Sequence, residues 1–202
     1  GGCVRDLLMS AVYGEPVEPK DWDIATSAKP EEIQKLFPDS VYENKFGTVL
    51  VKLEPQTSAD KNADQRGQEE GQRKSASSQR QSAIVEVTTF RLEGKYSDKR
   101  HPDEIKFAKT IEEDLGRRDF TVNAIALRIN TNIRISTNDT NSELVDPFRG
   151  QQDLKAKVIR AVGDPDARFQ EDALRLLRAI RFSCQLNFSI EPKTLDAITR
   201  HA

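Results

Sequence analysis

The chain has 202 residues, 36% of them hydrophobic, and a formal net charge of −2 at pH 7, which suits one ordinary domain with a buried core. No apolar run approaches the roughly 20 residues needed to span a bilayer, and two distant cysteines, Cys3 and Cys184, exclude a disulfide framework or a paired zinc site. We therefore expect a cytoplasmic protein without membrane contact. Because the overall charge is slightly negative, any contact with nucleic acid would have to come from a local basic surface.

The N-terminal part alternates predicted helices and strands. Val4 to Met9 has helical character, and the preceding Gly1-Gly2 pair normally follows a strand, so we expect a fragment of a longer protein. Trp22 to Ala25 predicts a short strand. Pro30-Glu31-Glu32 then predicts the start of a helix that ends at Pro38, because proline fits the first turn and acids stabilise the positive end of the helix dipole.

Two longer strands are predicted next, at Val41 to Leu53 and at Ile84 to Phe90. Residues 54–83 between them contain no Val, Ile, Leu, Met or aromatic residue and cannot bury enough surface to order themselves. We interpret this segment as a disordered hairpin insertion. The alternative, an RNA-binding arm, is disfavoured because its charges are mixed and not basic.

The middle of the chain is less regular. Gly94 to Lys109 predicts a polar loop, whereas Phe120 to Ile129 is apolar with a mixed period that leaves helix and strand open. Ile133 to Ile135 and Leu144-Val145 predict a short hairpin that closes the sheet.

From Ala167 onward the pattern is helical. The predicted apolar stripe contains Phe169, Ala173, Leu176, Leu177, Ile180 and Cys184. Five arginines cluster in this region, namely Arg160, Arg168, Arg175, Arg178 and Arg181. We predict an α+β head at residues 1–157, with a mixed β-sheet flanked by helices, followed by an all-helical neck at residues 158–202 that is truncated at the C-terminus.

The first candidate site is Asp21-Trp22-Asp23. Alternate residues of a strand point to the same face, so both carboxylates project together and repel one another unless a cation lies between them. Mg²⁺ takes oxygen ligands and suits nucleotidyl transfer, while solvated or helix-capping acids are the alternative. Just upstream, a turn at Gly2 would expose backbone N–H groups, and Arg5 would reach a phosphate.

Six segments occur in the order of a known family: GGCVRDLL, DWDIATSAKPEEIQKLF, FGTV, EVTTFR, RRDFTVNAIAL and RFQEDALRLLRAIRF. The chain resembles the class II, bacterial-type tRNA nucleotidyltransferases and the bacterial poly(A) polymerases, which belong to the DNA polymerase beta-like nucleotidyltransferase superfamily. The resemblance covers nearly the whole chain outside the insertion, and six ordered motifs are far more specific than any one of them.

The resemblance implies roles for individual residues. Gly2 and Arg5 would hold the triphosphate of the incoming nucleotide, and Asp21 and Asp23 would bind two Mg²⁺ ions. Glu86, on a strand expected to pair beside the strand of Asp23, is the candidate for the third acid that is usual in this superfamily; an exposed strand glutamate is the alternative.

Further roles concern the nucleotide itself. In the RRDFT-x-N motif the resemblance implies contacts with sugar and phosphates from Arg117, Arg118, Asp119 and Asn123. Asp172 and Arg175 lie three residues apart, which places them on one helix face, and the resemblance implies that they read the base. Arg178 and Arg181 would extend that helix face toward the phosphates. For the pair at 172 and 175, an ordinary intrahelical ion pair is the alternative.

The implied activity is template-independent addition of CCA to the 3′ end of tRNA from CTP and ATP, with tRNA or another RNA as partner and no DNA. The loop predicted at residues 94–109 resembles the flexible loop that the final A requires, with Arg91, Gly94, Tyr96, Asp98 and His101. A bacterial poly(A) polymerase is the alternative within the class. A non-catalytic RNA-binding relative is the alternative outside it.

Overall fold

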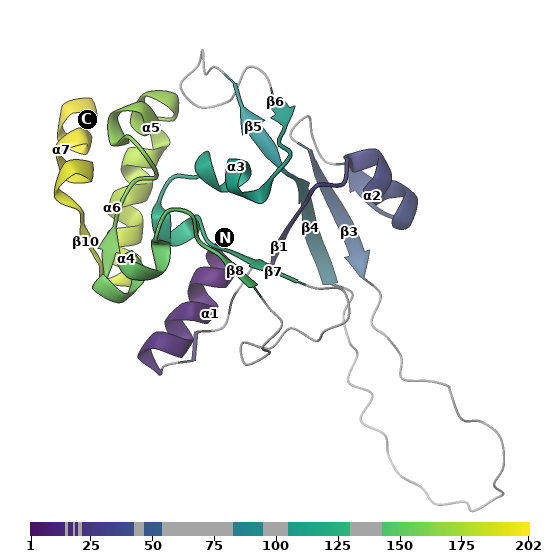
Figure 1. Cartoon of the computed structure of the whole chain (residues 1–202), viewed down its shortest axis with the longest axis horizontal. Coiled ribbons are helices and arrows are strands. Elements are labelled where there is room, and N and C mark those ends of the chain that lie inside the picture. The colour runs from purple at the N-terminus through teal and green to yellow at the C-terminus, as the bar shows by residue number, and fades with distance from the viewer. Residues whose placement is uncertain are drawn as a thin grey trace, which may run out of the picture.

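The computed structural model describes residues 1–14, 16–17, 19, 22–42, 47–53, 83–94, 105–129 and 143–202. Figure 1 shows the main sheet at one end and the last three helices at the other. The helices are α1 (Gly2–Tyr13), α2 (Pro30–Leu36), α3 (Ile111–Gly116), η1 (Thr121–Asn123), α4 (Gly150–Ala156), α5 (Pro165–Glu171), α6 (Leu174–Leu186) and α7 (Pro192–His201). The strands are β1 (Asp23–Thr26), β2 (Val41–Tyr42), β3 (Thr48–Leu53), β4 (Ala83–Thr89), β5 (Arg91–Glu93), β6 (Ile105–Phe107), β7 (Ala126–Arg128), β8 (Glu143–Val145), β9 (Val158–Ile159) and β10 (Ser189–Ile190).

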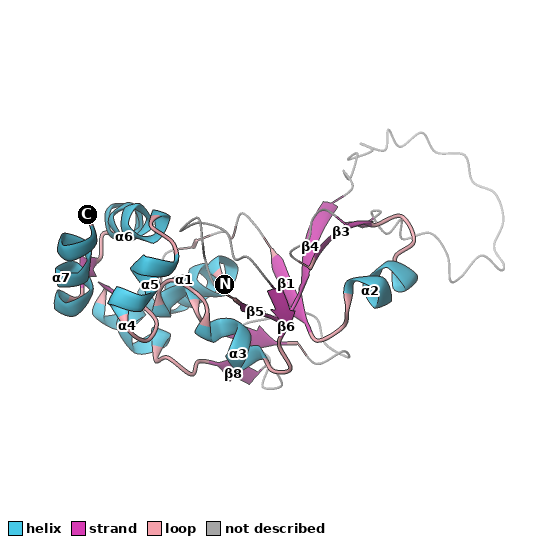
Figure 2. Ribbon diagram, turned by 90° about the horizontal axis from the view of Figure 1, so that it is seen from above, coloured by secondary structure: helices cyan, strands magenta, loops and turns pink. Residues whose placement is uncertain are grey.

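The main sheet is mixed, as predicted, with strand order β1-β4-β3-β2. β1 runs parallel to β4, and the other two pairs are antiparallel. Side chains alternate between the two faces of a strand, so Val49 and Val51 of β3 pack under Ile33 of α2, while Thr48 faces the opposite side, where a cavity lies. Figure 2 shows α2 beside this sheet.

The predicted N-terminal helices are confirmed. α1 extends beyond Val4 to Met9 and ends at Gly14, whose φ of 72° is a left-handed conformation that glycine adopts without strain. α2 begins at Pro30, and the Glu32 side chain accepts a hydrogen bond from the Lys29 backbone N at 2.7 Å. Local sequence chemistry alone therefore determines where α2 begins.

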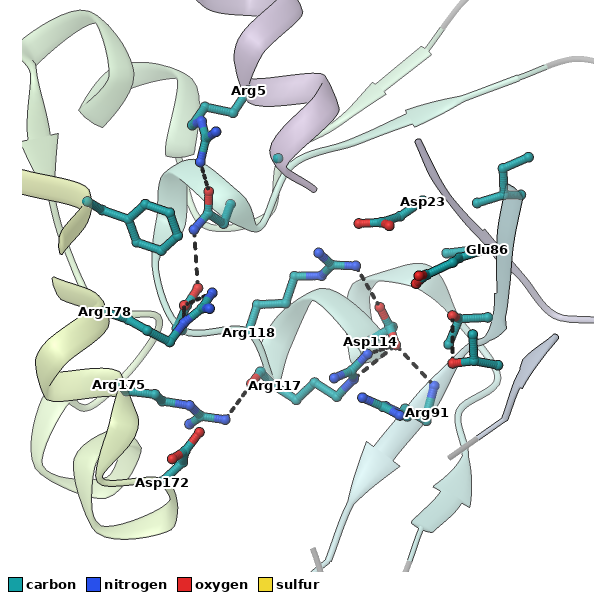
Figure 3. Close-up of a pocket in the computed structure, with 18 residues that line it drawn as sticks. Arg5, Asp23, Glu86, Arg91, Asp114, Arg117, Arg118, Asp172, Arg175 and Arg178 are labelled. Carbon is teal, nitrogen blue, oxygen red and sulfur yellow. Dashed lines mark hydrogen bonds and ion pairs between the residues drawn. The ribbon is translucent and has the colours of Figure 1, made fainter. Parts of the chain in front are cut away.

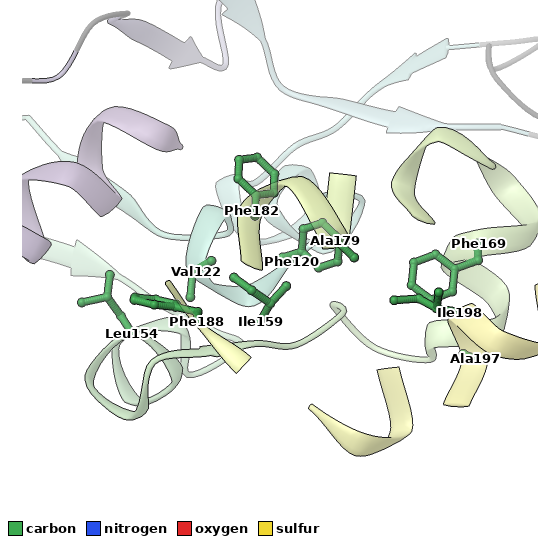
Figure 4. Packing of buried hydrophobic residues seen from close by; sticks show 10 residues of the cluster. All are labelled: Phe120, Val122, Leu154, Ile159, Phe169, Ala179, Phe182, Phe188, Ala197 and Ile198. Carbon is green, nitrogen blue, oxygen red and sulfur yellow. The ribbon is translucent and has the colours of Figure 1, made fainter. Parts of the chain in front are cut away.

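The largest apolar cluster joins the segment after α3 to the C-terminal helices (Figure 4). Phe120 meets Phe182 of α6 edge to face, with ring centroids 5.9 Å apart. The Thr121 backbone N donates to the Arg160 carbonyl at 2.9 Å, and Phe120 bridges Ala161. The segment at 120–123, whose secondary structure the sequence left open, is thus the buried connection between sheet and helices.

Several strand predictions need correction. Val41 to Leu53 forms two antiparallel strands, β2 and β3, because the chain reverses direction between them. Residues 105–107 of the predicted polar loop form β6, which pairs with β5. β8 pairs with β7 in a separate two-stranded sheet and does not close the main one. The predicted strand at 133–135 and all but the last residue of the 54–83 insertion lie outside the described residues.

The predicted apolar stripe of the C-terminal helices is wrong in part. The helical pattern divides into α5 and α6 at Asp172, and this break changes the phase of the buried face. The buried residues of α6 are Arg175, Ala179 and Phe182. Leu177 and Ile180 are 65% and 48% exposed, and Cys184 is exposed. The predicted all-helical neck also contains β9 and β10, two residues each. Among the described helices, none is long and apolar enough to cross a membrane.

Candidate active site

A cavity of about 520 Å³ opens between the main sheet, α1, α3 and the α5–α6 junction. This volume is typical of a site for a small molecule. Six arginines and five acids line it: Arg5, Arg91, Arg117, Arg118, Arg175, Arg178, Asp23, Glu86, Asp114, Asp119 and Asp172. The remaining lining residues are Gly2, Ile24, Ala25, Thr48, Thr88, Asn123 and Phe182. Such a cavity suits a ligand that is itself strongly charged.

The acidic side of the cavity comes from two neighbouring strands. Asp23 of β1 is the register partner of Glu86 of β4, so the two side chains project from the same face of the sheet. Figure 3 shows their carboxylates next to one another. Two adjacent carboxylates repel, and an oxygen-only donor set is what Mg²⁺ prefers, so these residues fit a divalent cation.

Asp21, the predicted partner of Asp23 in metal binding, lies outside the described residues. Within the described part of the chain no group of three His, Cys, Asp or Glu residues is close enough to hold a metal ion. The pairing of Asp21 with Asp23 is therefore still a prediction, while Glu86 does lie beside Asp23.

The glycine pair has a different conformation from the predicted turn. Gly2 is the first residue of α1 and lines the cavity, and Gly1 is its N-cap. A Cβ on Gly1 would lie 3.3 Å from Arg118 Nη1 and 3.6 Å from Asp23 Oδ2. The absence of a side chain there lets Arg118 approach α1 closely, and the N-terminal end of this helix favours negative charge in the cavity.

A hydrogen-bonded chain links three distant segments on the basic side. Arg5 Nη1 donates to Asn123 Oδ1 at 2.8 Å, and Asn123 Nδ2 lies 3.4 Å from Asp119 Oδ1. Asp119 Oδ2 then accepts from Arg178 Nε at 2.6 Å. Arg5 and Arg178 both lie over the ring of Phe182, at 5.6 and 5.1 Å from its centroid. The predicted residues on α1, η1 and α6 therefore meet in one cavity.

Asp172 and Arg175 do not share a helix face. Asp172 follows α5 in an extended conformation, with φ −141° and ψ 106°, and its Oδ1 accepts from the Leu174 backbone N at 2.9 Å. Arg175 is only 6% exposed and donates to the Arg168 carbonyl, Glu171 Oε2 and the Arg117 carbonyl at 3.2, 2.6 and 3.1 Å. Both residues nevertheless line the cavity.

Arg181 is the predicted site residue that the structure does not bring to the cavity. It lies 5.8 Å from the Phe182 ring centroid, and its Nε donates to Gln185 Oε1 at 3.3 Å. Conversely, Asp114 lines the cavity but was not predicted. Asp114 lies three residues before Arg117, a spacing that is typical of an ion pair on a helix. The sequence shows this spacing, but it does not distinguish a buried pair from an exposed one.

Two sequence comparisons relate the chain to known proteins. The sequence profile of the poly A polymerase head domain matches residues 1–79 and 54–160. A CCA-adding enzyme of Enterococcus faecalis is 43% identical over 199 residues, which is 98% of this chain and 38% of that protein. A CCA-adding enzyme of Geobacillus thermodenitrificans is 40% identical over 100% of this chain and 39% of its own length.

The fold is similar to solved structures. The Bacillus stearothermophilus CCA-adding enzyme in complex with CTP superposes with a TM-score of 0.70 at 35% identity, over 100% of this chain and 38% of that one. A tRNA nucleotidyltransferase complexed with a primer tRNA and an incoming ATP analog gives a TM-score of 0.61 at 25% identity, over 100% of this chain and 45% of that one. The predicted α+β class is confirmed, and the chain spans 38% to 45% of the length of the relatives compared.

Proposed function

Because the chain belongs to the family of the poly A polymerase head domain, we propose that it is the catalytic head of an enzyme that adds CCA to the 3′ end of tRNA from CTP and ATP. The observation that carries this proposal is the cavity itself, where an acidic pair on β1 and β4 faces arginines from α1, from the end of α3 and from α6. Relatives named CCA-adding enzymes match nearly all of this chain, which supports CCA addition over poly(A) addition.

Nucleotidyltransferases of this family are metal-dependent, and the ion we propose is Mg²⁺. Asp21 and Asp23 would hold two such ions, with Glu86 as the third acid beside them. When bound, one ion would make the primer 3′-hydroxyl a better nucleophile and the other would neutralise the departing pyrophosphate. The chain's own contribution is to hold the Asp23 and Glu86 carboxylates on adjacent strands and in register.

The arginines would bind and orient the nucleotide. Arg118 points toward the acidic pair in Figure 3, where a triphosphate would lie between them. Arg5 and Arg178, already held by Asn123 and Asp119, would contact the phosphates and sugar from the other side. Fixed guanidinium groups stabilise developing negative charge without reorganising during the reaction.

Asp172 and Arg175 would select the base. Arg175 is held by three acceptors, so its position in the cavity is defined before a nucleotide binds. A carboxylate and a guanidinium present acceptors and donors that match the hydrogen-bonding edges of cytosine and adenine. This arrangement would replace a nucleic-acid template.

We also propose the division into a head at 1–157 and a neck at 158–202, and a cytoplasmic location. The concentration of α5, α6 and α7 after residue 157 supports the division, although Phe120 and Phe182 share one core across it. The partner of the full-length protein would be tRNA and not DNA.

The test is incorporation by the full-length protein that contains this chain. It is incubated with Mg²⁺, a tRNA lacking its terminal CCA, and labelled CTP, ATP or both. We expect two C residues from CTP, and one A only after both C residues are present. Tailing of varied RNAs by ATP alone would show a poly(A) polymerase instead. No incorporation by folded protein that still binds tRNA would show a non-catalytic RNA-binding relative.

A further inference from the structure

Asp114 on α3 has an unusual environment for a carboxylate. The residue is 1% exposed although it lines the cavity. A buried carboxylate is costly unless cations and hydrogen-bond donors surround it. The groups that surround Asp114 are therefore informative about its role.

One carboxylate oxygen accepts three hydrogen bonds. Arg117 donates to Asp114 Oδ1 through Nε at 3.0 Å and through Nη2 at 2.9 Å. The Arg91 backbone N, where β5 begins, donates to the same oxygen at 3.1 Å. This single atom therefore fixes both the guanidinium of Arg117 and the start of the β5–β6 pair.

The other oxygen interacts with the second arginine by charge alone. Asp114 Oδ2 lies 3.6 Å from Arg118 Nη2 (Figure 3). Within the described part of the chain, neither this oxygen nor Arg118 Nε has a hydrogen-bond partner, although both are buried. Arg118 is thus charge-compensated on one side and directed toward Asp23 and Glu86 on the other.

The contacts continue to α6 through the backbone. The Arg117 carbonyl accepts from Arg175 Nη2 at 3.1 Å. A shift of the Arg117 backbone, which the bond between its side chain and Asp114 restrains, would therefore move an acceptor of Arg175. The three arginine side chains concerned, Arg117, Arg118 and Arg175, all line the cavity.

We propose that Asp114 is a positioning residue for nucleotide selection, because its buried carboxylate sets the positions of Arg117 and Arg118 and, through Arg117, that of Arg175. This inference rests on the proposed function. Asp114 acts through its neighbours and is not a catalytic residue. A displacement of about 1 Å in a binding group can cost roughly a hundredfold in rate, so the position of this charge matters as well as its presence.

The test compares Asp114→Asn and Asp114→Glu in the full-length protein. Asn keeps the shape and the acceptor for the Arg91 backbone N but removes the charge, whereas Glu keeps the charge and displaces it. On a tRNA ending in CC, we expect both variants to discriminate ATP from CTP about tenfold less well, with a KM for ATP raised by a similar factor and a smaller change in kcat. Equilibrium binding of ATP should weaken by a similar factor, and binding of CTP should weaken less.

A double variant tests the route through Arg175. If Asp114 acts by way of Arg175, the discrimination of Asp114→Asn/Arg175→Lys should equal that of Arg175→Lys alone, whereas independent effects would multiply.

Asp153→Asn is the matched control. Asp153 is also a buried acid, 7% exposed, and binds Thr121 Oγ1 at 2.7 Å and Arg160 Nε at 3.0 Å, but it does not line the cavity. We expect a lower Tm with unchanged discrimination. The inference would be overturned if both Asp114 variants kept the wild-type discrimination and KM for ATP. If only Asp114→Glu folds, the same result from that variant alone would overturn it. Absence of incorporation by the wild-type protein would instead contradict the proposed function.

Discussion

At the scale of single residues, the site depends on pairs that the chain brings together from separate segments. Asp23 and Glu86 are adjacent because β1 and β4 pair in parallel, and Arg5 reaches Asn123 because α1 packs on the segment after α3. The residue types were predictable because carboxylates, arginines and glycines recur in motifs. Asp114 was not predicted, since burial by β5 and two arginines appears only after folding.

The residue whose change is expected to be most damaging is Asp23. Asp23→Asn keeps the shape of the side chain but removes a charge that would bind the metal ion. We expect single-turnover CMP incorporation to fall at least about a hundredfold, which corresponds to about 2.7 kcal/mol of lost transition-state stabilisation. Asp39→Asn, an exposed acid outside the cavity, is the control and should retain wild-type turnover. Near-normal turnover of Asp23→Asn would show that the metal assignment is wrong.

At the scale of secondary-structure elements, helix ends and breaks decide which side chains reach the cavity. α2 was predictable because proline and acidic residues mark its start. The break between α5 and α6 was not predictable, because the sequence keeps a helical pattern from Ala167 onward. In the structure, Asp172 ends α5, and its side chain accepts a hydrogen bond from the Leu174 backbone N. Aspartate competes for backbone N–H groups in this way and favours helix ends. The break leaves Arg175 buried and Leu177 exposed.

The contact between α4 and η1 leaves no room for a side chain at Gly150. A Cβ there would lie 2.1 Å from the Thr121 carbonyl O and 2.8 Å from Ile125 Cγ1. We expect Gly150→Ala to lower the free energy of unfolding by about 1–3 kcal/mol, because backbone must move to relieve the overlap. Urea denaturation measures this change. In the control, Gly116→Ala, the new Cβ would meet Phe148 at an ordinary 3.5 Å, so equal losses in both variants would contradict the steric explanation.

At the scale of the whole molecule, one core and one polar network join the C-terminal helices to the rest. Phe120, Val122 and Phe182 belong to the same buried cluster. Beside it, Arg160 binds Asp153 at 3.0 Å and Glu191 at 3.2 Å, so the N-cap residue of α7 is tied to α4. The core thus holds α6, which carries Arg175 and Arg178, and the polar network holds α7 beside α4.

Glu191 makes this network sensitive to acid. Burial raises its pKa, but hydrogen bonds from Thr194 and the charge of Arg160 outweigh burial and hold the pKa below the usual 4.5. A lowered pKa means that the ionised group contributes stability above pH 4.5, and that this stability is lost as the pH falls through the folded-state value. We expect Glu191→Gln to cost about 1 kcal/mol of unfolding free energy at neutral pH and progressively less in acid.

Thermal or urea denaturation across this pH range measures the difference between Glu191→Gln and the wild-type protein. Asp196→Asn, an exposed acid on the same helix, is the control and should show no such trend. A difference that stays constant down to pH values well below 4.5 would contradict the role of the ionised Glu191 carboxylate.

The sequence by itself determined the α+β class, the start of α2, the strands at Asp23 and Glu86, and most of the residues that line the cavity, because periodicity, helix caps and motif chemistry are local properties. Only the tertiary structure decided the register that makes Asp23 and Glu86 direct neighbours on strands already expected to pair, that Arg181 stays away from the cavity, and that Asp114 is buried among arginines. These facts depend on strand register, on the helix break at Asp172 and on packing between distant segments, which no local pattern records.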